Sequence, residues 1–226
     1  MEKRFGLTGN QLKLIAALTM LADHLGYILF PRMMIFRILG RIAFPLYAYM
    51  IAEGCRYTRN KLRYFLMLFG LGAGCQLVYY IVSKDTYLNI LLTFSLSVLL
   101  IYALQAAHQS KRTALWSGLF CAGVLAVMAM DMVLTIDYGF WGAMVPVLAA
   151  FGSIRKFPRW GTLLLMGAGL VLIDTGLGAV QYISLLALPL LMLYSGQRGK
   201  ANMKYFFYIF YPLHLVVLEG ISMLLK

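Results

Sequence analysis

The sequence predicts an all-α integral membrane protein, built as a single polytopic bundle of about nine transmembrane helices. Hydrophobic residues make up 62% of the 226 residues, charged residues make up only 12%, and the mean hydropathy is +0.80. A soluble domain carries about 25% charged residues. The basic residues also gather in alternate loops, a distribution that marks the cytoplasmic loops of membrane proteins. We therefore expect one transmembrane domain over residues 1–226, in the bacterial inner membrane and in contact with its lipids.

Nine apolar runs between polar breaks define the expected spans. A helix needs about 20 residues to cross the hydrocarbon core of a bilayer. The runs are 11–30, 33–54, 64–82, 87–107, 114–134, 138–153, 161–177, 179–195 and 204–225. The sixth, seventh and eighth runs are short, so we expect about eight to ten helices.

The loop charges orient this bundle with its N-terminus in the cytoplasm. In that orientation 15 of the 20 lysines and arginines face the cytoplasm and three face outward, while Arg37 and Arg41 lie inside the second run. This topology accounts for the net charge of +12, so we expect no nucleic-acid partner. The three cysteines are scattered and lack metal-ligand spacing, which argues against a metal site or a disulfide framework.

Four ionisable residues interrupt the first two runs. Asp23 and His24 lie in the first, and Arg37 and Arg41 lie in the second. Each such group costs about 2.5–3.5 kcal/mol in a spanning helix and commonly marks a functional site. Adjacent residues project about 100° apart on a helix, so we expect Asp23 to pair with a guanidinium of the second run while His24 faces a cavity. The arginines share one face, which leaves one of them for a ligand oxygen. Alternatively, a buried ion pair only orients the two helices.

These residue types favour a catalytic interpretation. Histidine suits general base catalysis near neutral pH, and arginine stabilises an oxyanion. His24 is the predicted base, Arg37 and Arg41 are the predicted oxyanion stabilisers, and Asp23 holds an arginine in place. In the last run, His214 continues a row of tyrosines at steps of three, namely Tyr205, Tyr208 and Tyr211. His214 is therefore a second candidate base or ligand, unless the row is only an aromatic packing seam.

A basic segment follows the second run. Its candidate phosphate-binding residues are Arg56, Tyr57, Arg59, Asn60, Lys61 and Arg63. Arginine binds phosphate in a bidentate manner, and Tyr57 offers a ring for stacking, so a nucleotide-like donor from the cytosol fits this segment. The alternative is that these charges set the membrane topology and contact lipid head groups.

Five segments resemble the TraX family. They are LKLIAALTMLADHLGYILFP at 12–31, RILGRIAFPLYAYMIAEGCRYTRN at 37–60, LNILLTFSL at 88–96, DYG at 137–139 and KYFFYIFYPLHL at 204–215. The similarity runs from the first expected helix to the last, and it is loose between 97 and 203. The TraX family in turn resembles the integral membrane acyltransferases that use acyl-CoA. The resemblance implies an acyl-CoA-dependent O- or N-acyltransferase, with acetyl-CoA as the donor and no metal.

In that interpretation, the acceptor is a sugar, a lipid, an amine or a peptide N-terminus. The resemblance assigns the catalytic histidine to His24 and the intramembrane arginines to Arg37 and Arg41, and it places His214 in the terminal PLH motif. Two other functions use the same residues. One is a transporter or binding protein for an organic anion, which the arginines would hold. The other is a scaffold in which the ion pair only fixes helix packing.

Overall fold

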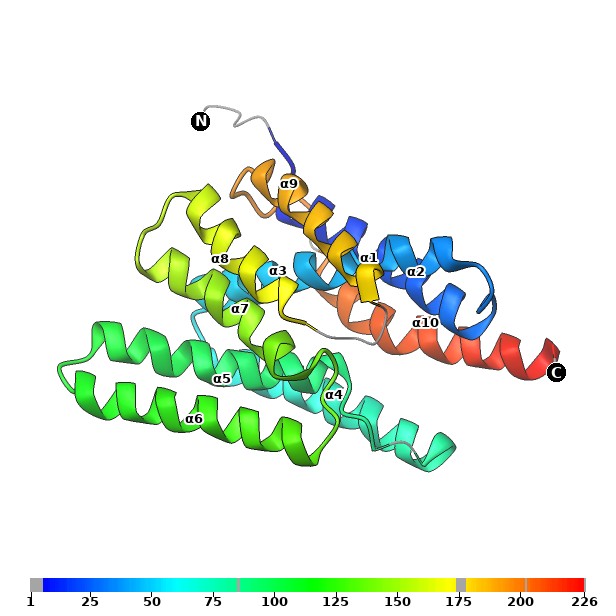
Figure 1. Ribbon diagram of the computed structural model, residues 1–226, viewed down its shortest axis with the longest axis horizontal. Coiled ribbons are helices and arrows are strands. Elements are labelled where there is room, and N and C mark those ends of the chain that lie inside the picture. The colour runs from blue at the N-terminus through cyan, green and yellow to red at the C-terminus, as the bar shows by residue number, and fades with distance from the viewer. Residues whose placement is uncertain (1–5, 85, 174–177, 202, 226) are drawn as a thin grey trace. The chain divides into compact units, whose positions relative to one another are not determined.

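The computed structural model describes residues 6–84, 86–173, 178–201 and 203–225, and it is helical over most of them. Within these residues the only bridges between extended segments are two isolated ones. The elements, shown in Figure 1, are α1 Gly9–Ile28, α2 Met34–Gly40, α3 Ala43–Tyr57, α4 Lys61–Ser83, α5 Ile90–Gln109, α6 Thr113–Val133, α7 Gly139–Ile154, α8 Arg159–Val171, the 3-10 helix η1 Gly178–Leu186, α9 Ala187–Met192 and α10 Lys204–Leu225. The prediction of an all-α protein is therefore confirmed.

Each predicted apolar run contains a helix or a pair of helices, but only four segments of the described chain have the length and composition to cross a membrane. These four are Met34–Tyr57, Lys61–Ile81, Ile90–Gln109 and Thr113–Val133. The apolar helices that start at Gly139, Arg159, Gly178 and Ile209 are shorter. Helix α1 has 20 residues but also contains Lys13, Asp23 and His24, which lower its apolar character.

The second run differs from a single uninterrupted helix. Helix α2 ends at Gly40 and α3 begins at Ala43, with a tight turn between them. In this turn the N–H groups of Arg41 and Ile42 donate to the carbonyls three residues earlier, at 3.3 and 3.4 Å. This 3-10 geometry tightens the winding of the chain beside Arg41, where the candidate site lies.

The described chain divides into two compact units. The first consists of Met1–Met50 and Leu177–Lys226, and the second consists of Ile51–Gly176. In the first unit, α1 packs against α2 and α10. Helix α1 begins with a capping box: Thr8 Oγ1 accepts from the Gln11 N–H, and Gln11 Oε1 accepts from the Thr8 N–H at 2.8 Å. Leu12, Ala16 and Met20 recur every four residues and form its buried stripe.

The second unit is built around α5, which packs against α4, α6 and α7. Its buried polar residues bond neighbouring helices. Ser97 Oγ donates to the Ala143 carbonyl of α7 at 2.7 Å, and Asn89 Nδ2 donates to the Gly72 carbonyl of α4 at 2.9 Å. Since both side chains are buried, these bonds fix which faces of α4 and α7 meet α5.

Candidate functional site

Two glycines allow α1 and α2 to approach closely and so position Asp23. A Cβ atom at Gly26 would lie 2.6 Å from the Phe36 Cβ, and a Cβ atom at Gly40 would overlap the Asp23 carboxylate. The stacked rings of Phe30 and Phe36, with centroids 5.7 Å apart, close the connection between the two helices. The Asp23 carboxylate is therefore held against the backbone of α2.

Asp23 binds both Arg37 and Arg41 rather than one arginine. Its Oδ2 atom accepts from Arg37 Nη1 at 2.8 Å, and its Oδ1 atom accepts from Arg41 Nη2 at 2.7 Å. The exposed fraction of the Arg41 side chain is 4%, against 22% for Arg37. The sequence predicted that one guanidinium would be left for a ligand. Instead, the two oxygens of one carboxylate are shared between the two cations.

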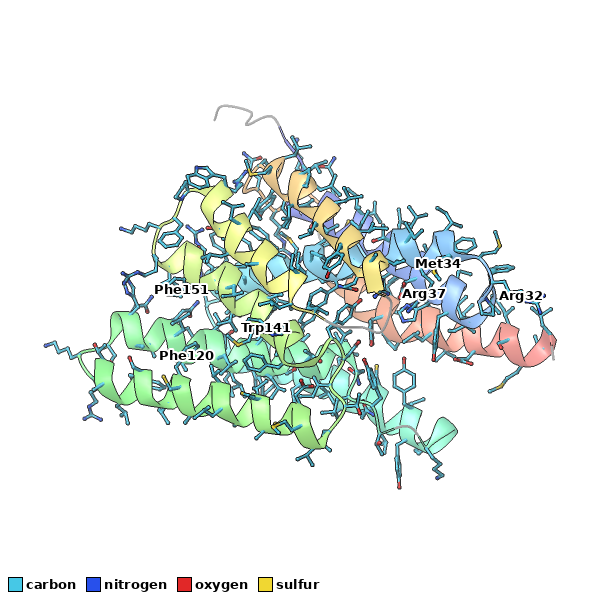
Figure 2. All side chains as sticks on the ribbon, viewed as in Figure 1. Arg32, Met34, Arg37, Phe120, Trp141 and Phe151 are labelled. Atoms are coloured by element: carbon cyan, nitrogen blue, oxygen red, sulfur yellow. The ribbon has the colours of Figure 1, made fainter. Side chains whose placement is uncertain are left out.

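Arg37 is the more accessible member of this network. It lies on α2, one helical turn after the loop that carries Arg32 (Figure 2). Its guanidinium lies 5.4 Å from the centroid of the Tyr27 ring, so a cation–π contact also holds it in place. A guanidinium has five N–H donors, and Arg37 gives one of them, on Nη1, to an acceptor among the described residues.

The 3-10 helix η1 brings Gln181 to the network and carries a second buried polar residue, Ser184, and the sequence analysis missed both. Arg41 Nη1 donates to Gln181 Oε1 at 3.4 Å. Ser184 lies three residues later, on the same face, because side chains at i and i+3 eclipse in a 3-10 helix. Ser184 is fully buried and its hydroxyl has no hydrogen-bond partner among the described residues. Polar residues inside the apolar run 179–195 were the signal for this part of the site.

His24 faces away from the ion pair and meets His214 of α10. The His214 Nε2 atom lies 3.2 Å from the His24 Nδ1 atom, and the two rings meet edge to face with centroids 4.9 Å apart. His214 is buried and stacks on Phe210 at 5.0 Å, while Tyr211 meets it edge to face at 5.9 Å. The two predicted histidines are thus in direct contact.

The backbone around these rings determines which nitrogen carries the proton. His214 Nδ1 lies 2.8 Å from the Phe210 carbonyl, and His24 Nδ1 lies 2.9 Å from the Met20 carbonyl. A carbonyl oxygen only accepts, so each Nδ1 atom must donate. The Nδ1–H group of His24 therefore lies between two acceptors, the Met20 carbonyl and the lone pair on His214 Nε2. The His24 Nε2 atom retains its lone pair, and within the described residues it makes no hydrogen bond.

The five residues predicted as catalytic therefore lie in the first unit as two linked groups. Asp23, Arg37 and Arg41 form an ion network, and His24 and His214 form an imidazole pair. The two groups are joined because residues 23 and 24 are neighbours on α1. Of the tyrosine row, Tyr211 contacts His214, whereas the side chains of Tyr205 and Tyr208 lie outside the described residues. In the described chain no three His, Cys, Asp or Glu side chains converge as metal ligands.

The basic segment belongs to the second unit and lies between α3 and α4. Asn60 caps α4, because its Oδ1 atom accepts from the Arg63 N–H at 2.9 Å. Two of its cations lie over aromatic rings: Arg56 is 5.3 Å from the Tyr57 centroid and Lys61 is 5.0 Å from the Tyr102 centroid. The predicted phosphate-binding residues are therefore close together and exposed.

Comparison with known proteins identifies a family and one curated relative. The model of the family described as TraX protein matches residues 8–222. A protein of Dichelobacter nodosus, described as the probable fimbrial assembly protein FimC of serogroup H1, is 28% identical over a 255-residue alignment that covers 100% of both chains. No solved structure matches the chain.

These findings correct the expected enzyme class. The sequence predicted an acyl-CoA-dependent O- or N-acyltransferase, and this prediction is wrong, because the curated relative is described as a fimbrial assembly protein and the family match gives no support for acyl transfer. The geometry differs from the expected oxyanion site in the same region, since the carboxylate of Asp23 already binds both guanidiniums.

Proposed function

The chain belongs to the TraX family, and from this relationship we propose that it is a membrane protein that takes part in the assembly of a fimbria. The observation that carries the proposal is the similarity to the fimbrial assembly protein along the whole of both chains. Since no large part of either chain is left unmatched, the shared sequence includes the segments that bear the ion network and the imidazole pair.

The proposal includes a membrane topology. We propose that the nine helical segments span the bacterial inner membrane, with the N-terminus in the cytoplasm. Four segments have the length and composition of complete spans. The excess of basic residues in alternate connections supports the orientation. In this topology the ion network and the imidazole pair lie within the membrane.

A deletion experiment tests the assembly role. Removing the gene from a fimbriated host should reduce the number of surface fibres counted by electron microscopy and the amount of fibre subunit in the sheared fraction. The total cellular amount of subunit should change little, because the proposed defect is in assembly. The parent gene supplied in trans should restore the fibres. A deletion strain with the parent's fibre number would contradict the proposal.

A second candidate function is the binding of an organic anion at the ion network. Two observations favour it. Arg37 gives one of its five N–H donors to the described protein and is partly exposed, so an anion has donors to approach. The Ser184 hydroxyl is buried on the face of η1 that contacts Arg41, and it has no partner among the described residues. A carboxylate is the fitting class of anion, because a guanidinium binds it through two parallel N–H groups.

Equilibrium binding of radiolabelled hexanoate to the detergent-purified protein tests this second function. Arg37→Gln should weaken binding by about tenfold, since a hydrogen bond to a charged group contributes about 1.5–3 kcal/mol. Arg32→Gln is the matched control, because Arg32 is exposed in the loop just before α2. Hexanol of equal chain length should not compete. Equal binding to the Arg37→Gln and Arg32→Gln variants would exclude an anion site at Arg37.

A further inference from the structure

Three connections lie at one end of the second unit. Helix α5 packs against α4, α6 and α7, and successive helices in this unit are joined by short turns. At the opposite end, the α4–α5 and α6–α7 connections are bonded to each other: the Leu88 N–H donates to the Thr135 carbonyl at 2.9 Å, and the Asp137 N–H donates to the Leu88 carbonyl at 3.0 Å. The α3–α4, α5–α6 and α7–α8 connections therefore share the other end, which lies at the left of Figure 1.

This end of the unit carries a dense group of cations, which we call the basic end. Its lysines and arginines are Arg56, Arg59, Lys61, Arg63, Lys111, Arg112, Arg155, Lys156 and Arg159. All of them are exposed or partly exposed. No lysine or arginine of the described second unit lies elsewhere except Lys84, which follows α4 at the opposite end. The bundle therefore has a strong charge asymmetry along its length.

Few acids offset this charge. Among the described residues of the second unit, the acid at the basic end is Glu53, which lies 3.8 Å from Arg56. Asp131 and Asp137 lie at the opposite end, where Asp131 accepts from the Phe140 N–H. Six cations have no salt bridge within the described chain, namely Arg59, Arg63, Lys111, Arg112, Arg155 and Lys156. The basic end is thus available to an external anion.

Exposed aromatic and apolar side chains border these cations. Tyr57 is 62% exposed, Leu62 is 66% exposed and Trp160 is 60% exposed. They lie at the ends of α3, α4 and α8, where the apolar segments Lys61–Ile81, Ile90–Gln109 and Thr113–Val133 also begin or end. Tyrosine and tryptophan are enriched at the level of lipid head groups. The basic end therefore combines the two features of a surface at the membrane–water boundary.

We propose that the basic end is a binding surface for anionic phospholipids. The phosphodiester of the lipid binds the arginines of the α3–α4 and α5–α6 turns, and its acyl chains pack on the bordering apolar side chains. The contacts of Lys61 with Tyr102 and of Arg56 with Tyr57 limit the freedom of two of these cations before the lipid arrives. This site is distinct from the ion network and rests on membrane insertion, not on the fimbrial role.

Lipid titration of the purified full-length protein tests the proposal. Pyrene-labelled phosphatidylglycerol and phosphatidylcholine are titrated separately into protein held in a zwitterionic detergent. The parent should bind phosphatidylglycerol at least about tenfold more tightly, because each basic residue near an anionic lipid contributes about a fivefold factor. Arg59→Gln/Arg63→Gln/Arg112→Gln should remove most of that preference. Lys84→Gln, the matched change at the opposite end, should preserve it.

Two outcomes would overturn the proposal. One is a phosphatidylglycerol preference that the triple variant keeps or that Lys84→Gln also removes. The other is displacement of the lipid by coenzyme A at equal concentration, which would indicate a nucleotide site. The charge-preserving variant Arg59→Lys/Arg63→Lys/Arg112→Lys separates charge from folding, and it should keep the preference. Gel filtration and circular dichroism of all variants establish that they are folded.

Discussion

The Nε2 atom of His214 lies 3.2 Å from the Nδ1 atom of His24, and this contact joins residues that are 190 positions apart. It brings α10 to the C-terminal part of α1, beside Asp23. Both rings are oriented by carbonyl groups of their own helices. A charged His214 would place an Nε2–H donor against the Nδ1–H group of His24, so this contact favours a neutral His214.

We predict that both histidines carry their proton on Nδ1. In solid-state NMR spectra of protein labelled with ¹⁵N-histidine, His24 and His214 should each show a protonated Nδ1 and an unprotonated Nε2. His108 is exposed near the C-terminal end of α5, so His108→Gln assigns its signals without disturbing the pair. His214→Phe should shift the His24 Nδ1 resonance. A protonated Nε2 on His214 in the parent protein would contradict the assignment.

Removing the shared carboxylate should destabilise the first unit. Asp23→Asn leaves the buried guanidinium of Arg41 and the partly buried guanidinium of Arg37 without their anion, and the loss of one partner of a buried ion pair costs about 3–5 kcal/mol. The change should lower the midpoint of thermal unfolding in detergent. Arg32→Gln, in the exposed loop before α2, should leave the midpoint unchanged. An Asp23→Asn variant as stable as the parent would show that the ion network does not stabilise the fold.

Gly40→Ala should have a similar effect for a steric reason. The added Cβ atom would overlap the Asp23 carboxylate, so α1 and α2 must move apart and the bonds to Arg37 and Arg41 must lengthen. Gly70→Ala is the matched control in α4, since a Cβ atom there meets nothing within 4 Å. The control should be neutral or stabilising by up to about 1 kcal/mol, because alanine has the higher helix propensity. The midpoints of thermal unfolding of the two variants, measured in parallel, test this prediction. Equal midpoints for Gly40→Ala and Gly70→Ala would contradict it.

Much of the fold was predictable because apolar runs between polar breaks indicate helices directly. The nine runs correspond to the helical segments of the described chain, but the break between α2 and α3 was not foreseen. Gly40 ends α2 and Pro45 lies in the first turn of α3, so the sequence carried a local signal for the break that the analysis missed. Tertiary contacts act at the same place. Arg41 turns toward Asp23 and Gln181, and the chain tightens there to reach both.

Only the features of the site that depend on neighbouring residues in the sequence were predictable. The free-energy cost of ionisable groups in apolar runs singled out Asp23, His24, Arg37 and Arg41. Helical spacing placed Asp23 and His24 on different faces of the first helix, as observed. The partners of these residues depend on long-range packing. The sharing of Asp23 by both arginines and the contact between the histidines follow from how α2 and α10 pack on α1. The bond from Arg41 to Gln181 follows from the packing of η1 on α2.

Tyr87 should titrate at unusually high pH. Burial of the hydroxyl is the main cause of its raised pKa, and the nearby Asp137 carboxylate, which accepts its hydrogen bond at 3.0 Å, raises the pKa further. The folded state therefore favours the neutral phenol. This stabilisation is fully present below the unfolded pKa of about 10 and is lost as the pH rises toward the folded pKa. In NMR spectra of protein labelled with ¹³Cζ-tyrosine, the Tyr87 resonance is the one that Tyr87→Phe removes. Asp137→Asn should lower the titration midpoint of this resonance. An unchanged midpoint would exclude the Asp137 carboxylate as a cause of the raised pKa of Tyr87.

The three turns of the basic end should all be accessible from one side of the membrane. Single cysteines are placed at Arg59, Arg112 and Lys156, and at Lys84 at the opposite end, in a background in which Cys55, Cys75 and Cys121 are replaced by alanine. A membrane-impermeant maleimide added to intact spheroplasts should label the cysteine at 84 only, because the excess of basic residues retains the other three turns in the cytoplasm. Permeabilisation should then expose all three together. If only one of the three basic-end cysteines is labelled in intact spheroplasts, the three turns do not lie at the same end of the second unit. If all three are labelled, the turns do share one end, but that end faces outward and the proposed orientation is reversed.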